Sequence, residues 1–536
     1  MTSLKRATAL MTIGTVFSRL TGLLRLMAIA GALGIAESRL PDTYNLANTA
    51  PNILYELALG GVLTSVFVPV FVELLEKEGR ERAWEVASAL INLSLAALTT
   101  ITLIGVVAAP WIARFYAGRL EGADAVLQQD VLTFFLRLFI PQIIFYGLTA
   151  MTAGLLNAHK RFGAPMFTPI LNNLTVIAVM VYFYNSYGAV TLRDVTTGQQ
   201  LPLGLGTTVG VAVMGLSQIP FLKGLGRYRF TFSAGHPAVK KLGRLSVFVV
   251  GYVMANQVGY LIVQWLANGQ EGGYSAYISA FTFFMLPHGL FAVSIITALL
   301  PSMSEHAVNE RWDGFRERLS VGVRSTLLLV LPAAVGYFVL NEPIVDYLLK
   351  RGVLTQESVD LVAGVLRFFV IGLVPFSIFQ LFLRAFYAQQ NTKTPFLINL
   401  VAVAINTAIN IPMFAWLEVE GLAAGHALAY VFGVVLQGRA LSRRIGGLDG
   451  RRLLRSGIRI CAAAAGMGLV VWVGSITLAE PLLRGTFFEQ TLSLGGLVVV
   501  GGATYLALAK LFGVEELRLV TGLVGGRLKG GGVTDR

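Results

Sequence analysis

Long runs of apolar residues alternate with short polar segments along almost the whole chain. Examples are the runs 86–109, 166–184, 247–267, 325–340 and 461–478. Runs of this length match the roughly 20 residues that a helix needs to cross a bilayer core of about 30 Å. The pattern therefore predicts an all-α, polytopic membrane protein.

About fourteen such spans fit the sequence and leave no room for a large soluble domain. We predict spans at 7–33, 44–74, 86–110, 131–156, 166–186, 203–222, 245–267, 274–303, 319–340, 359–387, 395–416, 420–438, 460–478 and 490–509. The first span follows Lys5 and Arg6, as a signal peptide would, but it is too long for one and is interrupted by Arg19 and Arg25. We interpret it as a retained helix.

Composition excludes an ordinary soluble enzyme. Of the 536 residues, 55% are hydrophobic and only 13% are charged, and the mean hydropathy is +0.69, whereas soluble domains have about 25% charged residues. The single Cys461 argues against disulfides, thiolate metal sites and a cysteine nucleophile. The sequence has no nucleotide-binding motif, no metal-ligand spacing and no catalytic constellation, so we expect no cofactor, no metal and no primary, ATP-driven transport.

The net charge of +13 comes mainly from Lys and Arg residues in the loops on one side of the predicted spans. This asymmetry follows the positive-inside rule. It accounts for the basic balance without a nucleic-acid partner. It also predicts that both termini are cytoplasmic.

Landmarks of the first half recur in the second half about 230 residues later. Pro69 and Glu73 correspond to Pro301 and Glu305, and the segment 157–165 corresponds to 387–395. Arg137 and Arg367 follow the same offset. Each half then has six spans in the same orientation.

Parallel repeats of this kind are typical of secondary transporters, in which the substrate binds between the lobes. We predict an N-lobe at 1–225, a C-lobe at 226–445, two extra transmembrane helices at 446–515 and a cytoplasmic tail at 516–536. The alternative is an ancient duplication in a protein that transports nothing.

Two arginines lie deep in the first span and are the main candidates for a substrate site. A cation near the bilayer centre is costly and usually faces a cavity. Arg19 and Arg25 are six residues apart, about 120° around a helix, so they share a cavity only if it is wide or if the helix bends, as Thr21-Gly22 would allow. Guanidinium groups suit phosphate, which favours an anionic, phosphate-bearing substrate.

Other polar residues in the spans have structural alternatives. Glu56, after the Pro51-Asn52 break in the second span, either pairs with Arg19 or Arg25, which we favour, or carries a coupling proton. Interhelical hydrogen bonding and anchoring of helix ends are the commoner uses of such residues, and they apply to Arg137, Arg367, Arg384, Asn256, Gln257, Asn406, Asn410, His288 and His426.

Several motifs together resemble one family. They are Phe17-Ser-Arg-Leu-Thr-Gly-Leu-Leu-Arg25, then Asp42, Pro51-Asn52-Ile-Leu, Ser65-Val-Phe-Val-Pro69, Asn157-Ala-His-Lys-Arg-Phe-Gly-Ala-Pro165 and Thr392-Lys-Thr-Pro395. Over nearly the whole chain the sequence resembles the MurJ/MviN lipid II flippases, within the multidrug, oligosaccharidyl-lipid and polysaccharide exporter superfamily.

The resemblance implies export of lipid II, the undecaprenyl-pyrophosphate-linked peptidoglycan precursor, to the outer leaflet of the bacterial cell membrane. It implies that Arg19 and Arg25 hold the pyrophosphate and sugar, with Asp42, Asn52 and Glu56 in the same binding region, and that the last two helices form a groove for the isoprenoid tail. Its further partners would be the lipid bilayer and proteins of cell-wall synthesis and division.

The chain departs from the family pattern at three positions. Leu26 stands where many members have Asp, and Tyr55 and Thr282 stand where members often have basic residues. These exchanges leave open a related lipid substrate. The alternatives are an exporter of another polyprenyl-linked glycan, a drug/cation antiporter of the same superfamily, and a cell-wall scaffold that transports nothing.

Overall fold

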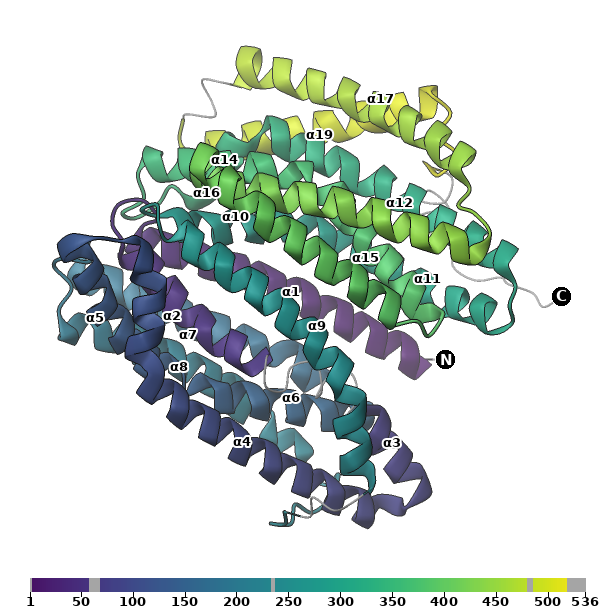
Figure 1. The fold of residues 1–536 in the computed structure, drawn as a ribbon. Coiled ribbons are helices and arrows are strands. Elements are labelled where there is room, and N and C mark those ends of the chain that lie inside the picture. The colour runs from purple at the N-terminus through teal and green to yellow at the C-terminus, as the bar shows by residue number, and fades with distance from the viewer. Residues whose placement is uncertain (1, 57–67, 233–236, 480–484, 518–536) are drawn as a thin grey trace. The chain divides into compact units, whose positions relative to one another are not determined.

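The computed structural model describes residues 2–56, 68–232, 237–479 and 485–517, and these residues form helices and no strands (Figure 1). The chain divides into two compact units. The first is Met1–Ala276 with Leu349–Ser358, and the second is Tyr277–Leu348 with Val359–Arg536. Two predicted features fall partly outside the described residues. These are residues 65–67 of the motif at 65–69, and the tail from residue 518 onward.

The first unit holds nine helices, among which α1 packs along α7, and α7 along α8. They are α1 (Thr2–Leu33), α2 (Leu40–Tyr55), α3 (Val68–Lys77), α4 (Gly79–Tyr116), α5 (Gly122–Phe139), α6 (Gln142–Ala158), α7 (Gly163–Tyr187), α8 (Thr197–Leu216) and α9 (Pro237–Ala267), counted over the described part of this unit. The start of α10 (Gly273–Pro287) also belongs to this unit.

The second unit continues from α10 and ends with the last two long helices. It contains α11 (Val293–Val308), α12 (Trp312–Val339), α13 (Asn341–Leu349), α14 (Gln356–Ile371), α15 (Leu373–Ala388), α16 (Lys393–Ile445), α17 (Gly450–Gly474) and α19 (Phe487–Leu511). A π-helical turn, His288–Ala292, joins α10 to α11.

Ten helices of the described residues are long and apolar enough to cross a membrane, or eleven if α14 and α15, bent by 48°, form one span. The predicted all-α polytopic class is therefore confirmed. Two predicted spans, 395–416 and 420–438, lie on the single helix α16, which bends at Glu418 (φ 51°). The predicted spans 44–74 and 245–267 include residues or side chains outside the described part of the chain, so the number fourteen stays a prediction.

The helix-ending turns repeat between the two halves. Lys160 (φ 60°) and Gln390 (φ 55°), 230 residues apart, both adopt the left-handed conformation. After each, the next amide donates to a carbonyl five residues back, from Arg161 to Leu156 and from Asn391 to Phe386. This is the Schellman ending of a helix, so the sequence repeat recurs as a repeat of local geometry.

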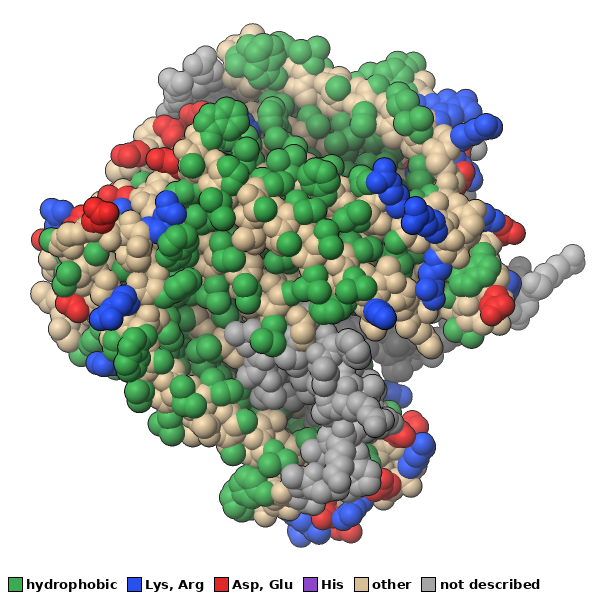
Figure 2. All heavy atoms as spheres, viewed as in Figure 1, with side chains coloured by type: hydrophobic (Ala, Val, Ile, Leu, Met, Phe, Trp, Pro, Cys, Tyr) green, Lys and Arg blue, Asp and Glu red, His purple; other side chains and the backbone are tan. Residues whose placement is uncertain are grey.

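Hydrophobic side chains are spread widely over the face drawn in Figure 2, and Lys, Arg, Asp and Glu form smaller separate clusters on it. Many large aliphatic or aromatic side chains on the long helices are exposed, including Leu103 and Val107 on α4, and Val498 and Val499 on α19. A surface of this composition is suited to lipid.

The last two helices are fixed to α12 by packing and by a buried ion pair. Ile460, Met467 and Leu497 share a core with Leu328 of α12. Beyond α19, Glu516 pairs with Arg324 of α12 and accepts a hydrogen bond from Ser456 Oγ of α17 at 2.8 Å. Arg324 is 3% exposed and Glu516 is 1% exposed.

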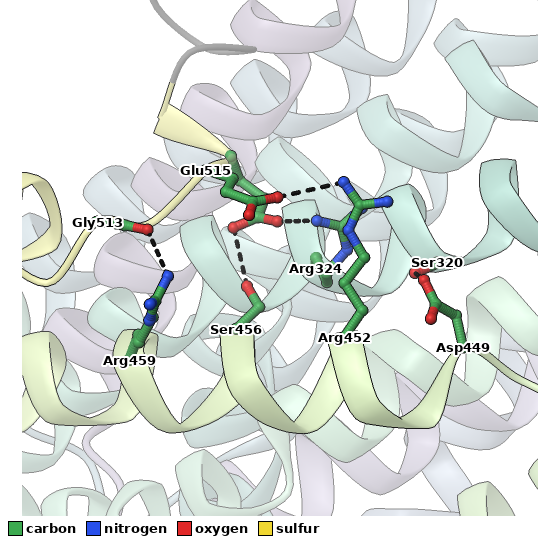
Figure 3. A network of polar contacts seen from close by, with 9 residues as sticks. Ser320, Arg324, Asp449, Arg452, Ser456, Arg459, Gly513 and Glu515 are labelled. Carbon is green, nitrogen blue, oxygen red and sulfur yellow. Dashed lines mark hydrogen bonds and ion pairs between the residues drawn. The ribbon is translucent and has the colours of Figure 1, made fainter.

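Exposed contacts extend this network along α17. Figure 3 shows Arg452 beside Glu515, and Arg459 beside the carbonyl of Gly513, with nitrogen–oxygen distances of 3.2 and 2.8 Å. The segment after α19 is therefore held against α17 and α12 at several points.

Candidate functional site

The first helix packs against α7 through a polar contact at the middle of its length. Asn173 Nδ2 of α7 donates to Thr21 Oγ1 at 3.0 Å, and Gly22 lies beside that amide. Thr21 Oγ1 in turn donates to the carbonyl of Phe17 at 2.9 Å. Thr21-Gly22 therefore forms part of a helix contact, and α1 continues as one helix from Thr2 to Leu33.

Arg25 is half-buried beside tyrosines from two other helices. Its guanidinium interacts electrostatically with the hydroxyl groups of Tyr44 on α2 and Tyr146 on α6. Tyr146 is also hydrogen-bonded to Asn52, and the Tyr44 hydroxyl lies 2.7 Å from Thr207 Oγ1 of α8. Arg25 and Asn52, two predicted site residues, thus both interact with Tyr146.

Arg19 lies on the exposed face of α1, which otherwise carries large apolar side chains. Phe17, Leu20 and Leu24 are 52%, 53% and 51% exposed. Arg19 is itself exposed. An exposed guanidinium within an apolar stripe suits an amphiphile that has an anionic head and a hydrocarbon tail.

Asp42 is fully buried at the start of α2 and contacts the beginning of α10. The amide of Ser275 donates to Asp42 Oδ1 at 2.7 Å, and Asn45 Nδ2 donates to Ser275 Oγ at 3.0 Å. Because the N-terminus of a helix has unpaired amides and a partial positive charge, a carboxylate there is favourable. Asp42 therefore has a positioning role in the fold that the sequence did not predict, and its role in substrate binding stays a prediction.

Glu56, at the end of α2, is half-buried and does not pair with the α1 arginines. Among the ion pairs of the described residues, none joins Glu56 to Arg19 or Arg25. The favoured pairing is therefore wrong for this structure. Arg25 instead interacts electrostatically with Tyr44 and Tyr146, and Arg19 is exposed.

A second cluster of hydrogen-bonded polar residues lies in the first unit, and the sequence did not predict it. Gln128 of α5 donates to Asn268 Oδ1 at 3.0 Å, and Asn268 Nδ2 donates to the carbonyl of Tyr116 at 2.9 Å. Tyr116 donates to Gln264 at 2.8 Å. Gln128 and Asn268 stand in polar stretches near the ends of their helices, and the sequence alone does not say which of these positions meet.

Several of the other polar residues in the spans contact protein groups. Asn406 and Asn410 hydrogen-bond to each other, and His288 Nδ1 lies 3.0 Å from Ser377 Oγ. Arg384 lies over the ring of Tyr387, and His426 is packed among aromatic rings that include Phe369. These contacts agree with the structural alternative for such residues.

Residues 29–493 match the family model described as lipid II flippase MurJ. The chain belongs to this family. Its matched segment includes Asp42, Asn52 and Glu56, whereas Arg19 and Arg25 precede it. Members of the lipid II flippase family are transporters, so the chain is a multi-pass membrane transporter and not an enzyme.

Relatives in the lipid II flippase family match almost end to end. A probable lipid II flippase MurJ of Rhizobium meliloti is 28% identical over 94% of this chain and 93% of its own length. One of Haemophilus influenzae is 27% identical over 95% of this chain and 99% of its own.

Solved structures support the same fold. A structure of lipid II flippase MurJ in an inward closed conformation has a TM-score of 0.76 at 22% identity, covering 96% of this chain and 100% of that one. An inward-facing multidrug resistance MATE transporter has a TM-score of 0.65 at 14% identity, covering 82% and 98%. The fold is thus shared across the wider superfamily.

Two of the residues that depart from the family pattern, Tyr55 and Thr282, contact neighbouring protein groups. Tyr55 is buried, with its ring centroid 6.0 Å from that of Tyr146. Thr282 Oγ1 donates to the carbonyl of Ile278 at 2.8 Å, within its own helix. Neither residue supplies a cation where family members often have one.

Proposed function

We propose that this chain moves lipid II from the inner to the outer leaflet by alternating access, with the head group recognised at α1. Membership of the lipid II flippase family supports the transport of lipid II. The observation that supports this site is that half-buried Arg25 interacts electrostatically with Tyr44 and Tyr146, while Arg19 lies on an exposed apolar face of the same helix.

This arrangement suits both parts of a polyprenyl pyrophosphate. Guanidinium groups form paired hydrogen bonds to phosphate oxygens, and tyrosine hydroxyls add neutral donors beside them. The apolar side chains of Leu20 and Leu24 offer a surface for hydrocarbon. In the proposal, Asn52 and Glu56 contact the sugar and Asp42 keeps α2 in place.

The proposed location is the bacterial cell membrane, with both termini in the cytoplasm. The excess of Lys and Arg in the loops on that side supports this orientation. The substrate then enters from the leaflet in which cytoplasmic enzymes complete it. Proteins of cell-wall synthesis and division are proposed partners at the same membrane.

Complementation of a bacterium depleted of its own MurJ tests this function, scored by the appearance of lipid II in the outer leaflet. We expect the wild-type chain to rescue growth, and Arg19→Ala or Arg25→Ala to abolish rescue at equal expression. Each loses charge-assisted hydrogen bonds of about 1.5–3 kcal/mol. Arg137→Ala is the matched control, because Arg137 is an exposed arginine of α5 outside the proposed site.

The second candidate is export of another polyprenyl-linked glycan. The absence of a cation at Tyr55 and Thr282 favours it, since fewer positive charges alter how the head group is held. If the wild-type chain is inserted and folded but lipid II stays in the inner leaflet, lipid II is excluded as its substrate and this candidate takes its place.

A further inference from the structure

The polar segment that follows α8 is held along the start of α4 by backbone and side-chain contacts. Arg80 Nε donates to the carbonyl of Leu225 at 2.6 Å, and the amide of Arg229 donates to Ser88 Oγ at 3.1 Å. Further along, Asn92 Nδ2 donates to the carbonyl of Thr231 at 2.8 Å. Residues 222–232, here called the α8 linker, are therefore ordered against α4.

Between the α8 linker and α4 lies a hollow of about 380 Å³. Volumes of this size are within the range of small-molecule sites. Three arginines and one carboxylate line it, namely Arg80, Arg227, Arg229 and Glu81, beside Trp84 and two glycines. Because the arginines outnumber the single carboxylate, the hollow has a net positive charge.

Ion pairs within the protein do not neutralise the three arginines of the hollow. Arg229 is 3.7 Å from Glu81, and both side chains are exposed, so water weakens this pair. Arg80 is held by linker carbonyls, which neutralise no charge. Arg227 has no hydrogen bond or ion pair to any residue that the structure describes.

Trp84 supplies a donor that the protein does not satisfy. Trp84 is only 4% exposed, and its Nε1–H has no acceptor among the described residues. A Cβ built on Gly226 would lie 2.2 Å from both Nε1 and Cδ1 and 2.3 Å from Cγ, so the linker backbone packs against the five-membered ring that carries Nε1, and both residues line the hollow. A buried donor without a partner is destabilising, and an acceptor oxygen of a ligand would remove that cost.

The hollow also lies at the N-terminus of the 38-residue helix α4. The first four amides of a helix lack partners within it, and its dipole favours an anion there. No side-chain cap bonds this end, where Glu78 precedes Gly79. The arginines, the indole N–H and the helix amides are all donors, and together they suit one acceptor-rich anion.

We propose that this hollow is a binding site for a phosphate group, separate from the α1 arginines. Two sources have this chemistry: the headgroup of an anionic phospholipid, and a soluble phosphate compound. The neighbouring side chains Tyr228, Phe230 and Phe232 are 52%, 79% and 48% exposed. Aromatic residues next to arginines are typical of the membrane interface, so the lipid headgroup is the source we expect.

The indole signal of Trp84 tests the site on the full chain in nanodiscs. The chain has six tryptophans, and Trp84→Phe assigns the Nε1–H resonance in a ¹⁵N-indole spectrum. Inorganic phosphate is titrated in phosphatidylcholine nanodiscs, and a second series replaces part of that lipid by phosphatidylglycerol. We expect the Trp84 signal to shift with phosphatidylglycerol; a shift with inorganic phosphate instead assigns the site to soluble phosphates.

Single-charge variants separate a built site from general attraction. Arg227→Gln should raise the concentration needed for half the shift at least tenfold. Arg444→Gln is the matched control, because Arg444 is an exposed arginine at the end of α16. The proposal is overturned if neither probe moves the Trp84 signal, or if Arg444→Gln weakens binding as much as Arg227→Gln. Neither readout depends on which lipid the chain transports.

Discussion

Arg324 and Glu516 form a buried ion pair, in which each charge is stabilised by the other. Removing one partner of such a pair leaves a buried charge and costs about 3–5 kcal/mol, whereas replacing both by apolar residues is often neutral. We therefore expect Arg324→Met to lower the unfolding temperature strongly, and Arg324→Met with Glu516→Leu to restore most of it. Thermal unfolding of the purified chain in nanodiscs measures both.

The exposed neighbour of this pair provides the control. Arg452 and Glu515 lie 3.2 Å apart, with side chains 51% and 62% exposed, and exposed pairs contribute about 0–1 kcal/mol. Arg452→Gln should therefore change the unfolding temperature little. Equal losses from Arg452→Gln and Arg324→Met would contradict the importance of burial.

At the scale of single residues, the sequence indicates which side chains are unusual for their segment but not which residues they contact. Arg19 and Arg25 stand out because a cation in an apolar run is costly. Glu516 does not, because it follows the last span and its partner is 192 residues away. Asp42 was assigned to the substrate, yet its visible contact is an amide of α10, 233 residues along the chain.

At the scale of elements, Glu37 joins the α1–α2 loop to the segment 349–358 of the same unit. Its carboxylate accepts hydrogen bonds from the amide of Ile35 at 2.6 Å, from the amide of Thr355 and from Ser358 Oγ at 2.9 Å. Burial raises the pKa of Glu37, but these hydrogen bonds outweigh burial and leave the pKa below its ordinary value of 4.5.

A lowered folded pKa fixes the direction of the pH dependence. The stabilisation is fully present above about pH 4.5, the ordinary value, and is lost as the pH falls through the lower pKa of the folded state. We expect Glu37→Gln to lower the unfolding temperature at pH 7 and to differ less from wild type at low pH. Unfolding followed from pH 3 to pH 7 measures this.

A conservative exchange elsewhere in the loop serves as the reference. Ser38 Oγ accepts a hydrogen bond from the amide of Leu40 at 3.2 Å, and its side chain carries no charge. Ser38→Ala should therefore shift stability by a similar amount at every pH from 3 to 7. A constant difference between Glu37→Gln and wild type over that range would contradict the role of the Glu37 carboxylate.

Helices follow from the apolar runs, while helix pairs and breaks follow from contacts. The run of each long span is visible in the sequence, whereas the break between α5 and α6 at Pro141 falls inside the predicted span 131–156. The packing of α1 on α7 depends on Asn173 meeting Thr21, 152 residues away. Apolar helices in lipid have no amphipathic stripe that would indicate their neighbours.

At the scale of the whole molecule, contacts regroup segments that the order of the chain keeps apart. The segment 349–358 lies in the second half of the sequence but belongs to the first structural unit. The amide of Val353 donates to the carbonyl of Gly31 at 3.0 Å, and Gly352, at φ 64°, passes too close to Gly31 for a side chain. A repeat in sequence therefore predicts two similar halves without predicting which residues each unit contains.

The charge of the proposed substrate determines how the whole transporter responds to membrane potential. A pyrophosphate carries about two negative charges, and each gains about 2.3 kcal/mol per 100 mV on moving outward across an inside-negative membrane. At 100 mV the gain of about 4.6 kcal/mol corresponds to a shift of roughly a thousandfold in the distribution between leaflets. The potential alone is then sufficient to drive net export.

Proteoliposomes containing labelled lipid II test this, with a potassium diffusion potential set to zero or to 100 mV inside negative. We expect the outer-leaflet fraction to rise with the potential for the wild-type chain and to stay constant without protein. Arg25→Ala should slow the approach to either distribution without changing its end point, because a transporter alters rates and the substrate charge sets the equilibrium. An outer-leaflet fraction that is equal at both potentials would mean that cations move with the head group and cancel its charge.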